Sequence, residues 1–348
     1  MAREYFLRLA AGRHRAIVGT DLVLNQRDDA EDVRRDGAGL GRVVAESAAR
    51  WKTPLAIPLM DLRLEKADLL AAYGMGEEQA DRFHFETGPA KEVYAEGGFP
   101  ERQRAQIGAI EWVAANTELM PVGMAIGPFS LMTKLLADPI TPLAMALSGV
   151  TAEEDAGVAA VERCCRLAEA AVARSVKAQI EAGARAMIIC EPAANIVFLS
   201  PRQLAKSEGA FARFVLEPNL RVRSLMDEAG VDLIFHNCGH LDDKMVRAFG
   251  HVIHPSVLSM GSSRKLWQDA ALVPDDVVLF GNLPTRMFYS DADMPCELVA
   301  SMTRELAGRM EETGHPHILG SECDVLHVEG ASGTILKKVE ILLAEGRE

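Results

Sequence analysis

The chain has 348 residues, of which 49% are hydrophobic and 25% charged, and these proportions are ordinary for a globular protein. Lys and Arg number 37 against 50 Asp and Glu, which gives a formal net charge of −13. This composition excludes disordered and collagen-like classes and argues against binding to the phosphate backbone of nucleic acids. The sequence shows no long apolar run and no secretion signal, and six cysteines are too few for a disulfide scaffold. We therefore predict a cytoplasmic protein with reduced thiols and no membrane span.

In chain order, residues 1–50 show helical patterns and are predicted to form a cap. Beyond them, short apolar runs alternate with longer segments in which apolar residues recur at helical spacing. The predicted strands are Leu55–Met60, Arg82–Glu86, Val122–Ile126, Ala186–Cys190, Asp232–His236, Val252–Leu258, Val277–Phe280 and His317–Gly320. The predicted helices are Ala152–Ala182, Pro201–Ala229, Asp293–Thr313 and Ala331–Glu345.

Alternation of strands and helices over this length indicates a mainly parallel sheet. About eight strands favour a (β/α)8 TIM barrel, an α/β fold, with an N-terminal helical extension. No linker rich in Pro, Gly or Ser divides residues 1–348, so a single domain is predicted. A doubly wound open sheet is the alternative, but no glycine-rich nucleotide-binding motif follows a predicted strand.

The stretch Phe-His-Asn-Cys-Gly-His ends a predicted strand and contains His236 and Cys238. Cys323 follows another predicted strand, 85 residues further along the chain (323 − 238). Because the loops after parallel barrel strands open on one face, these three side chains can converge there. One imidazole and two thiolates are a good ligand set for Zn²⁺, and three protein ligands are typical of catalytic zinc. Taken singly, each residue is more often an ordinary packing or loop residue.

Other polar residues follow predicted strands and are expected to face the same barrel mouth. Glu191 and Asp61 are candidate catalytic residues, as general bases or substrate anchors, and Glu191 is also a candidate fourth zinc ligand. Alternatively, each carboxylate stabilises a helix N-terminus. Asn237 and Asn282 are candidates for binding substrate or cofactor, although turn formation explains both equally simply. His240 is a candidate partner for a zinc ligand.

The zinc motif and three further segments resemble one known superfamily. PVGMAIGPFSLMTKLL, CEPAANIVFLSPRQL and LFGNLPT, together with His236, Cys238 and Cys323, resemble the uroporphyrinogen decarboxylase superfamily. The zinc motif is similar to that of its methylcobamide:coenzyme M methyltransferase branch. This resemblance implies Zn²⁺ on those three residues and methylcobamide or cobalamin as the methyl carrier. It also implies two partners, a corrinoid protein and a small-molecule methyl acceptor such as a thiol, with a homodimer as one candidate assembly.

The sequence also departs from that superfamily. Decarboxylase members carry an Arg-Gln-Ala-Gly-Arg stretch near the N-terminus, where this chain has AGRHRAI, and Glu322 stands where relatives often have glycine. Because the zinc motif is present and the decarboxylase stretch is not, the resemblance implies a zinc-dependent corrinoid methyltransferase. The alternatives are a metal-independent decarboxylase of a tetrapyrrole or related acid, and a zinc-binding protein without catalytic activity.

Overall fold

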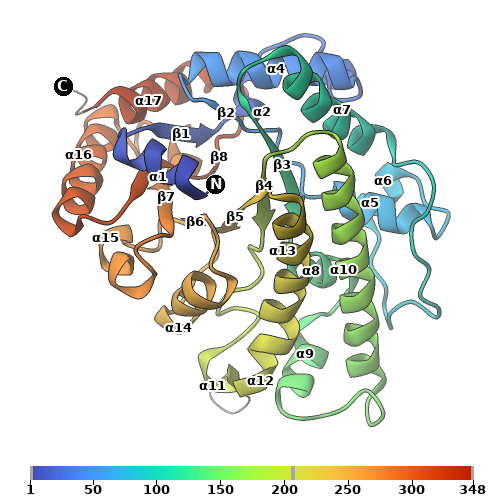
Figure 1. Cartoon of the computed structure of the whole chain (residues 1–348). Coiled ribbons are helices and arrows are strands. Elements are labelled where there is room, and N and C mark those ends of the chain that lie inside the picture. The colour runs from blue at the N-terminus through green and yellow to red at the C-terminus, as the bar shows by residue number, and fades with distance from the viewer. Residues whose placement is uncertain (1–2, 205–207, 346–348) are drawn as a thin grey trace.

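Eight parallel strands curl into a nearly closed barrel that is surrounded by helices (Figure 1). The computed structural model describes residues 3–204 and 208–345. The strand order around the sheet is β1-β8-β7-β6-β5-β4-β3-β2. The strands are β1 (Arg15–Val18), β2 (Leu55–Ala56), β3 (Met120–Ile126), β4 (Ala186–Cys190), β5 (Asp232–Asn237), β6 (Val257–Met260), β7 (Val278–Leu283) and β8 (His317–Asp324). This architecture confirms the predicted TIM barrel.

Helices cover the outside of the barrel. They are α1 (Arg3–Ala11), α2 (Thr20–Leu24), α3 (Ala30–Val33), α4 (Gly37–Arg50), α5 (Leu64–Ala71), α6 (Glu77–Arg82), α7 (Glu101–Asn116), α8 (Pro128–Leu135), α9 (Ile140–Leu147), α10 (Ala156–Glu181), α11 (Pro201–Leu204), α12 (Glu208–Phe211), α13 (Glu217–Ala229), α14 (Asp243–Ala248), α15 (Leu266–Asp269), α16 (Cys296–Thr313) and α17 (Ser332–Ala344). Two π-helical segments (Ala212–Leu216 and Phe249–Ile253) and two 3-10 turns (Ala270–Leu272 and Thr285–Met287) complete the set. Within the described residues, no helix has the length and apolar character needed to cross a membrane.

Alternation along the strands divides the core into an inner and an outer part. On β4, Ile188 and Cys190 belong to the apolar cluster inside the barrel, whereas Met187 and Ile189 pack with the surrounding helices. This period of two is the expected pattern for a closed barrel whose outer face is covered. The same alternation decides which polar residues at the strand ends can reach the barrel mouth.

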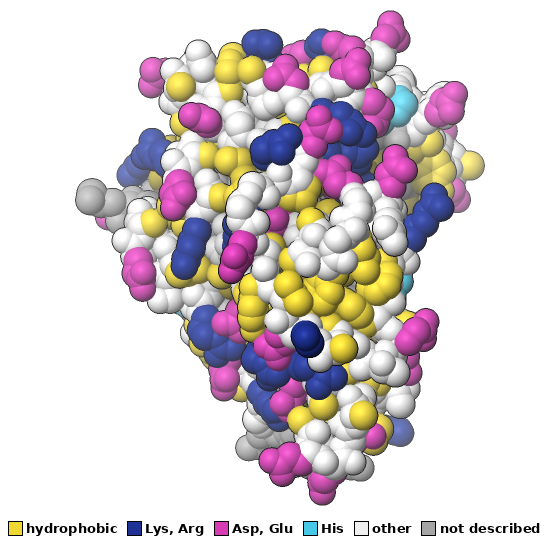
Figure 2. Space-filling view, turned by 90° about the vertical axis from the view of Figure 1, so that its right-hand side faces the viewer, with side chains coloured by type: hydrophobic (Ala, Val, Ile, Leu, Met, Phe, Trp, Pro, Cys, Tyr) yellow, Lys and Arg dark blue, Asp and Glu magenta, His cyan; other side chains and the backbone are white. Residues whose placement is uncertain are grey.

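The outer wall over α5, α6 and α10 carries side chains of both charges around an apolar area (Figure 2). Arg166 on α10 pairs with Glu92 at 2.6 Å, and Arg174 on the same helix pairs with Asp68 of α5 at 2.9 Å. The acidic excess of the chain is therefore not gathered into one acidic patch on this face.

The N-terminal region differs from the helical cap that the sequence predicts. Residues 15–18 form β1, which pairs with β8, so this segment contributes a barrel strand. Its apolar part is only the three residues Ala16–Val18, which follow Arg15, and the helical patterns on either side concealed the strand. Helix α1 covers the N-terminal end of the barrel, where the Arg3 side chain donates to the backbone carbonyls of Asp276 (3.0 Å) and His254 (2.8 Å).

Three other predicted elements also differ from the structure. Residues 82–86 form no strand, because the backbone there makes only an isolated bridge between Phe85 and Leu136. The sixth strand begins at Val257, since residues 249–253 continue helix α14 as a π-helical segment. The helix predicted over 201–229 is helical in all its described residues, but it contains a π-helical segment at Ala212–Leu216, between α12 and α13.

Candidate metal centre at the barrel mouth

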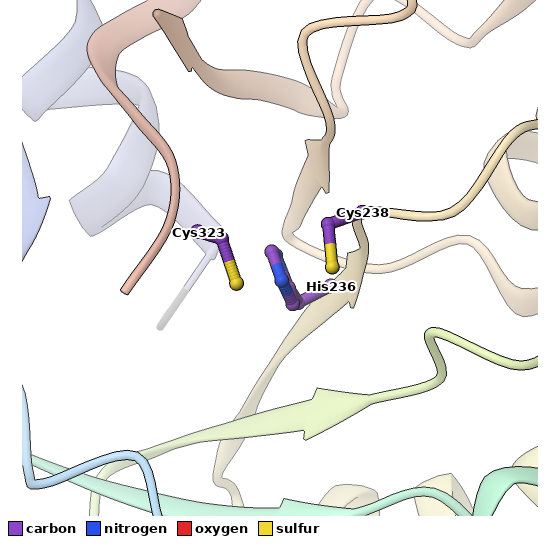
Figure 3. Close-up of side chains that lie close together, drawn as sticks. All are labelled: His236, Cys238 and Cys323. Carbon is purple, nitrogen blue, oxygen red and sulfur yellow. The ribbon is translucent and has the colours of Figure 1, made fainter. Parts of the chain in front are cut away.

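Three side chains from two distant parts of the chain meet at the C-terminal end of the barrel. His236 lies near the end of β5, Cys238 directly follows that strand, and Cys323 lies near the end of β8. One ligand atom from each residue lies within 4.8 Å of the other two. Figure 3 shows the imidazole lying between the two sulfur atoms. The structure therefore brings together the three predicted metal ligands.

His236 is held in a fixed orientation by the neighbouring strand. The residue is 3% exposed, and its Nδ1 lies 2.9 Å from Oγ of Ser259 on β6. Its Nε2 is buried, and no described protein atom hydrogen-bonds it. A buried polar atom without a partner is costly, so this nitrogen is suited to a ligand. The donor set of one imidazole nitrogen and two sulfurs matches the preference of Zn²⁺.

The two cysteine thiols change each other's pKa because they lie close together. The neighbouring Cys238, His236 and Arg286 side chains hold the pKa of the Cys323 thiol below its ordinary value, while the nearby Cys323 raises the pKa of Cys238. Nη2 of Arg286 also donates to Sγ of Cys238 over 2.9 Å. The arginine charge thus supports negative charge on the sulfur pair, and a thiolate is the form in which cysteine binds metals.

Apolar groups lie beneath and beside the three ligands. Sδ of Met60, in the loop after β2, lies 3.9 Å from Sγ of Cys323. A cavity of about 30 Å³ inside the barrel is lined by apolar side chains together with His236 and Ser259. Glu322 points its carboxylate toward the loop after β6, where Ser262 donates to it from Oγ (2.5 Å) and from the backbone nitrogen (3.0 Å). An apolar environment strengthens electrostatic interactions at the ligand atoms.

Glu191 is fully buried, and its carboxylate lies against α8. It accepts hydrogen bonds from the backbone nitrogens of Phe129 (3.0 Å) and Ser130 (2.8 Å) and from Nδ2 of Asn219 (2.8 Å). Burial raises its pKa, and these hydrogen bonds oppose that effect. A Cβ atom at Gly127 would lie only 2.1 Å from Cδ of Glu191, which explains the glycine before the Pro-Phe pair. These contacts favour a helix N-terminal role for Glu191.

Asp61 forms a two-point ion pair with Arg63. The Nε and Nη2 atoms of Arg63 lie 2.7 Å and 2.8 Å from the two carboxylate oxygens. Asp61 lines a cavity beside α5, α6 and the start of α7, although the preceding residue, Met60, contacts Cys323. Asp61 therefore follows a residue that contacts Cys323, but its own carboxylate is paired with Arg63.

The two asparagines hold loops around the barrel mouth. Nδ2 of Asn237 donates to the carbonyl of Ala194, and Oδ1 accepts from the backbone nitrogen of Gly239. Nδ2 of Asn282 donates to the carbonyls of Gly261 and Arg264. The binding roles predicted for Asn237 and Asn282 remain predictions, and these contacts fit the simpler interpretation as turn residues.

Sequence reasoning missed three neighbours of the ligands. Ser259, rather than the exposed His240, is the hydrogen-bond partner of the candidate ligand His236. Strand pairing could have found Ser259, because it is the register partner of His236 on β6. Arg286 and Met60 reach the site from loops after β7 and β2, and no sequence spacing indicates their approach.

A barrel with a histidine and two cysteines at its mouth defines a class of candidate metalloenzymes. Comparison with family models identifies the family within that class. The family model described as uroporphyrinogen decarboxylase (URO-D) matches residues 99–330, which is more than half of the chain. The chain belongs to the uroporphyrinogen decarboxylase family, as its sequence motifs predicted.

Comparison with solved structures found a similar chain described as a methyltransferase from Methanosarcina mazei. The TM-score is 0.68 at 15% sequence identity, and the match covers 95% of this chain and 91% of that chain. At this identity the likeness shows a shared fold. No curated protein matched the sequence.

Proposed function

We propose that this protein is a zinc-dependent methyltransferase. It moves a methyl group between a corrinoid, carried by a partner protein, and a small-molecule acceptor such as a thiol. A cytoplasmic location is part of the proposal. The Methanosarcina structure described as a methyltransferase supports this reading through the shared fold, and the chemistry of the ligand set supports it independently.

One observation carries the proposal. One ring nitrogen of His236 and the two cysteine sulfurs lie within 4.8 Å of one another, and Nε2 of His236 is buried without a hydrogen-bond partner among the described residues. Three protein ligands leave a fourth tetrahedral position for a substrate atom. Zinc bound there would lower the pKa of a substrate thiol and supply its thiolate near neutral pH.

The protein's own residues would orient and polarise the site. When Oγ of Ser259 accepts a hydrogen bond from Nδ1–H of His236, the lone pair on Nε2 faces the sulfurs. Arg286 donates to Sγ of Cys238 and so stabilises the negative charge that the two sulfurs carry together. Because the scaffold already fixes the His236 ring and the Arg286 guanidinium, only the acceptor and the methyl donor remain to be aligned for transfer.

The rim of the mouth supports docking of a large apolar group. Val197 in the loop after β4, Met287 and Tyr289 after β7, and Leu326 after β8 are 62%, 41%, 51% and 55% exposed. Large apolar side chains gathered at a site entrance are typical of interaction surfaces. A corrin ring presented by a partner protein fits such a rim, since it is a broad macrocycle.

The alternative, decarboxylation of a tetrapyrrole, has less support. The arginines of AGRHRAI lie at the start of β1, at the opposite end of the barrel from the mouth. The Arg15 guanidinium donates to the backbone carbonyls of Leu342 and Glu345 near the end of α17, and Arg13 pairs with Glu311. These cations do not lie where they could bind substrate carboxylates at the metal centre.

The test combines zinc analysis with a methylcobalamin demethylation assay across a panel of thiols. About one zinc per chain and a zinc-dependent rate are expected. His236→Ala and Cys323→Ala variants should lose zinc and activity while keeping the circular dichroism spectrum of the parent. Demethylation by the zinc-free protein at the rate of the zinc-loaded protein would contradict the mechanism. Zinc binding without methyl transfer to any thiol, with free cobalamin or with a corrinoid protein, would favour a non-catalytic zinc protein.

A further inference from the structure

A second candidate site lies at the N-terminal end of the barrel, away from the metal centre. A cavity of about 620 Å³ opens between α1, α13 and the starts of β4, β5 and β6. Figure 1 views the molecule with α1 and its N-terminus in front of the strands. Asp232 begins β5 and lines this cavity, whereas His236, near the end of the same strand, belongs to the metal centre. The two sites therefore occupy opposite ends of one strand.

Four arginines line this cavity although the chain carries a net charge of −13. They are Arg3, Arg8, Arg185 and Arg223, and among the described residues of the lining only Asp227 and Asp232 are acidic. Burial raises the pKa of Tyr5 between them, while the nearby charges of Arg185 and Arg8 oppose that shift. Such a concentration of guanidinium groups creates a local field that attracts anions.

Two of these arginines have no acidic partner. Arg3 pairs with Asp276 at 3.1 Å and Arg223 with Asp227 at 3.1 Å. Among the described residues, no carboxylate lies within ion-pair distance of Arg8 or Arg185. The backbone of Arg185 is fixed in the sheet, since its nitrogen donates to the carbonyl of Pro121 at 2.9 Å. The Arg8 guanidinium lies over the ring of Tyr5, with its Cζ 5.9 Å from the ring centroid, so it meets an aromatic face rather than a carboxylate. Neither guanidinium charge is therefore neutralised by a described carboxylate.

The floor of the cavity contains an acceptor without a donor. Asp232 is 6% exposed, and one carboxylate oxygen, Oδ1, accepts a hydrogen bond from Oγ of Ser256 at 2.5 Å. The other oxygen, Oδ2, is buried and has no hydrogen-bond partner among the described residues. A ligand hydroxyl would satisfy this acceptor, whereas an isolated anion would not.

We propose that this cavity binds a phosphorylated small molecule that carries hydroxyl groups. The phosphate lies between Arg8 and Arg185, because guanidinium groups match phosphate oxygens in charge and in two-point geometry. A hydroxyl of the ligand donates to Oδ2 of Asp232. The cavity is large enough for a ligand of this kind rather than for an ion alone. The inference is independent of the proposed methyl transfer.

The test is calorimetric titration of the full chain with ribose 5-phosphate, inorganic phosphate and unphosphorylated ribose. Ribose 5-phosphate is expected to bind more tightly than phosphate, and ribose is expected not to bind. Arg8→Gln and Arg185→Gln should each weaken ribose 5-phosphate binding by about tenfold or more. Asp232→Ala should reduce ribose 5-phosphate affinity to that of inorganic phosphate.

Arg13→Gln is the matched control. It removes the same charge just beyond α1, where Arg13 pairs with Glu311 outside the cavity, and it should leave the affinity unchanged. Arg8 and Arg185 are exposed, so their variants should melt like the parent even if Asp232→Ala fails to fold. The proposal is overturned if ribose binds as well as its phosphate, if neither phosphate probe binds, or if the Arg8→Gln, Arg185→Gln double variant binds ribose 5-phosphate like the parent.

Discussion

Oγ of Ser259 on β6 lies 2.9 Å from Nδ1 of His236 on β5, and the two residues are register partners in adjacent strands. The pairing of the strands therefore sets the orientation of the imidazole before any ligand binds. The hydrogen bond leaves Nε2 as the nitrogen that faces Cys238 and Cys323. The same contact predicts how the metal centre will respond to loss of a single hydroxyl group.

Ser259→Ala should weaken zinc binding by roughly 10- to 100-fold, the usual effect of losing the partner of a ligand histidine. The ring would lose the contact that selects its tautomer and fixes its rotation. Competition with a chromogenic zinc chelator measures the effect. Ser301→Ala, at an exposed position on α16, is the matched control and should bind zinc like the parent. Equal zinc affinity in both variants would show that Ser259 does not orient the ligand.

Glu191→Gln separates the catalytic role predicted from sequence from the structural role that its contacts favour. The carboxylate accepts from two α8 backbone nitrogens and from Asn219, and the amide nitrogen of glutamine could not accept any of these bonds. Unfolding free energy should fall by about 1–3 kcal/mol, the usual cost of leaving a buried donor unsatisfied. Chemical denaturation measures this loss.

The catalytic rate distinguishes the two roles of Glu191. For a structural role, the folded Glu191→Gln variant should keep its zinc and a methyl-transfer kcat within a few-fold of the parent. A loss of kcat greater than about 100-fold, with zinc content and stability unchanged, would establish general acid–base catalysis instead.

The fold was predictable wherever the local pattern of apolar residues matches the residues that are buried in the structure. Ala186–Cys190 was predicted with its exact bounds because the run is apolar throughout and buried on both faces. The same rule failed at β1, whose four residues include Arg15. That side chain is buried, and its charge is satisfied by carbonyls near the end of α17, more than 300 residues away. No local pattern can reveal a partner at that distance.

The convergence of the three candidate ligands was predictable because strand ends on a barrel share one face. Cys238 and Cys323 needed only this rule to be placed together. This rule could not predict where the side chains of Glu191 and Asp61 point, because a residue just beyond a strand can turn toward the mouth or toward the helices. Alternation on β4 puts Cys190 inside the barrel and leaves Glu191 pointing at α8. The alternation of inward and outward side chains along a strand therefore predicts the direction of a side chain at its end better than the position of that residue after the strand does.

Glu65 on α5 predicts a pH dependence of stability. Burial raises its pKa from 4.5 to about 7, although a hydrogen bond from Ser175 opposes the shift. Because the folded chain holds this proton more tightly than the unfolded chain, stability is lost as the pH rises from 4.5 to about 7. Glu65→Gln removes the ionisation, and its unfolding free energy should exceed that of the parent by about 1–3 kcal/mol at pH 8.

Denaturant titrations at pH 5 and pH 8 measure this effect of Glu65. The difference between variant and parent should be small at pH 5 and larger at pH 8. Glu118→Gln, at an exposed position, is the control and should track the parent at both values. A Glu65→Gln variant that is less stable than the parent at pH 8 would show that the carboxylate is stabilised in its charged form.

The apolar rim predicts a defect confined to partner docking. Val197→Glu and Leu326→Glu place charges on side chains that are 62% and 55% exposed in loops after β4 and β8. Each should raise KM for a methylated corrinoid protein about tenfold, since a buried charge opposes an apolar contact. Zinc content and kcat should stay near the parent values, because neither side chain is among the three candidate ligands.

Val252→Glu is the control for the rim variants, since that residue is 46% exposed but precedes β6 at the other end of the barrel. If all three variants raise KM equally, net charge rather than the rim governs docking. If none does, the corrinoid protein binds elsewhere.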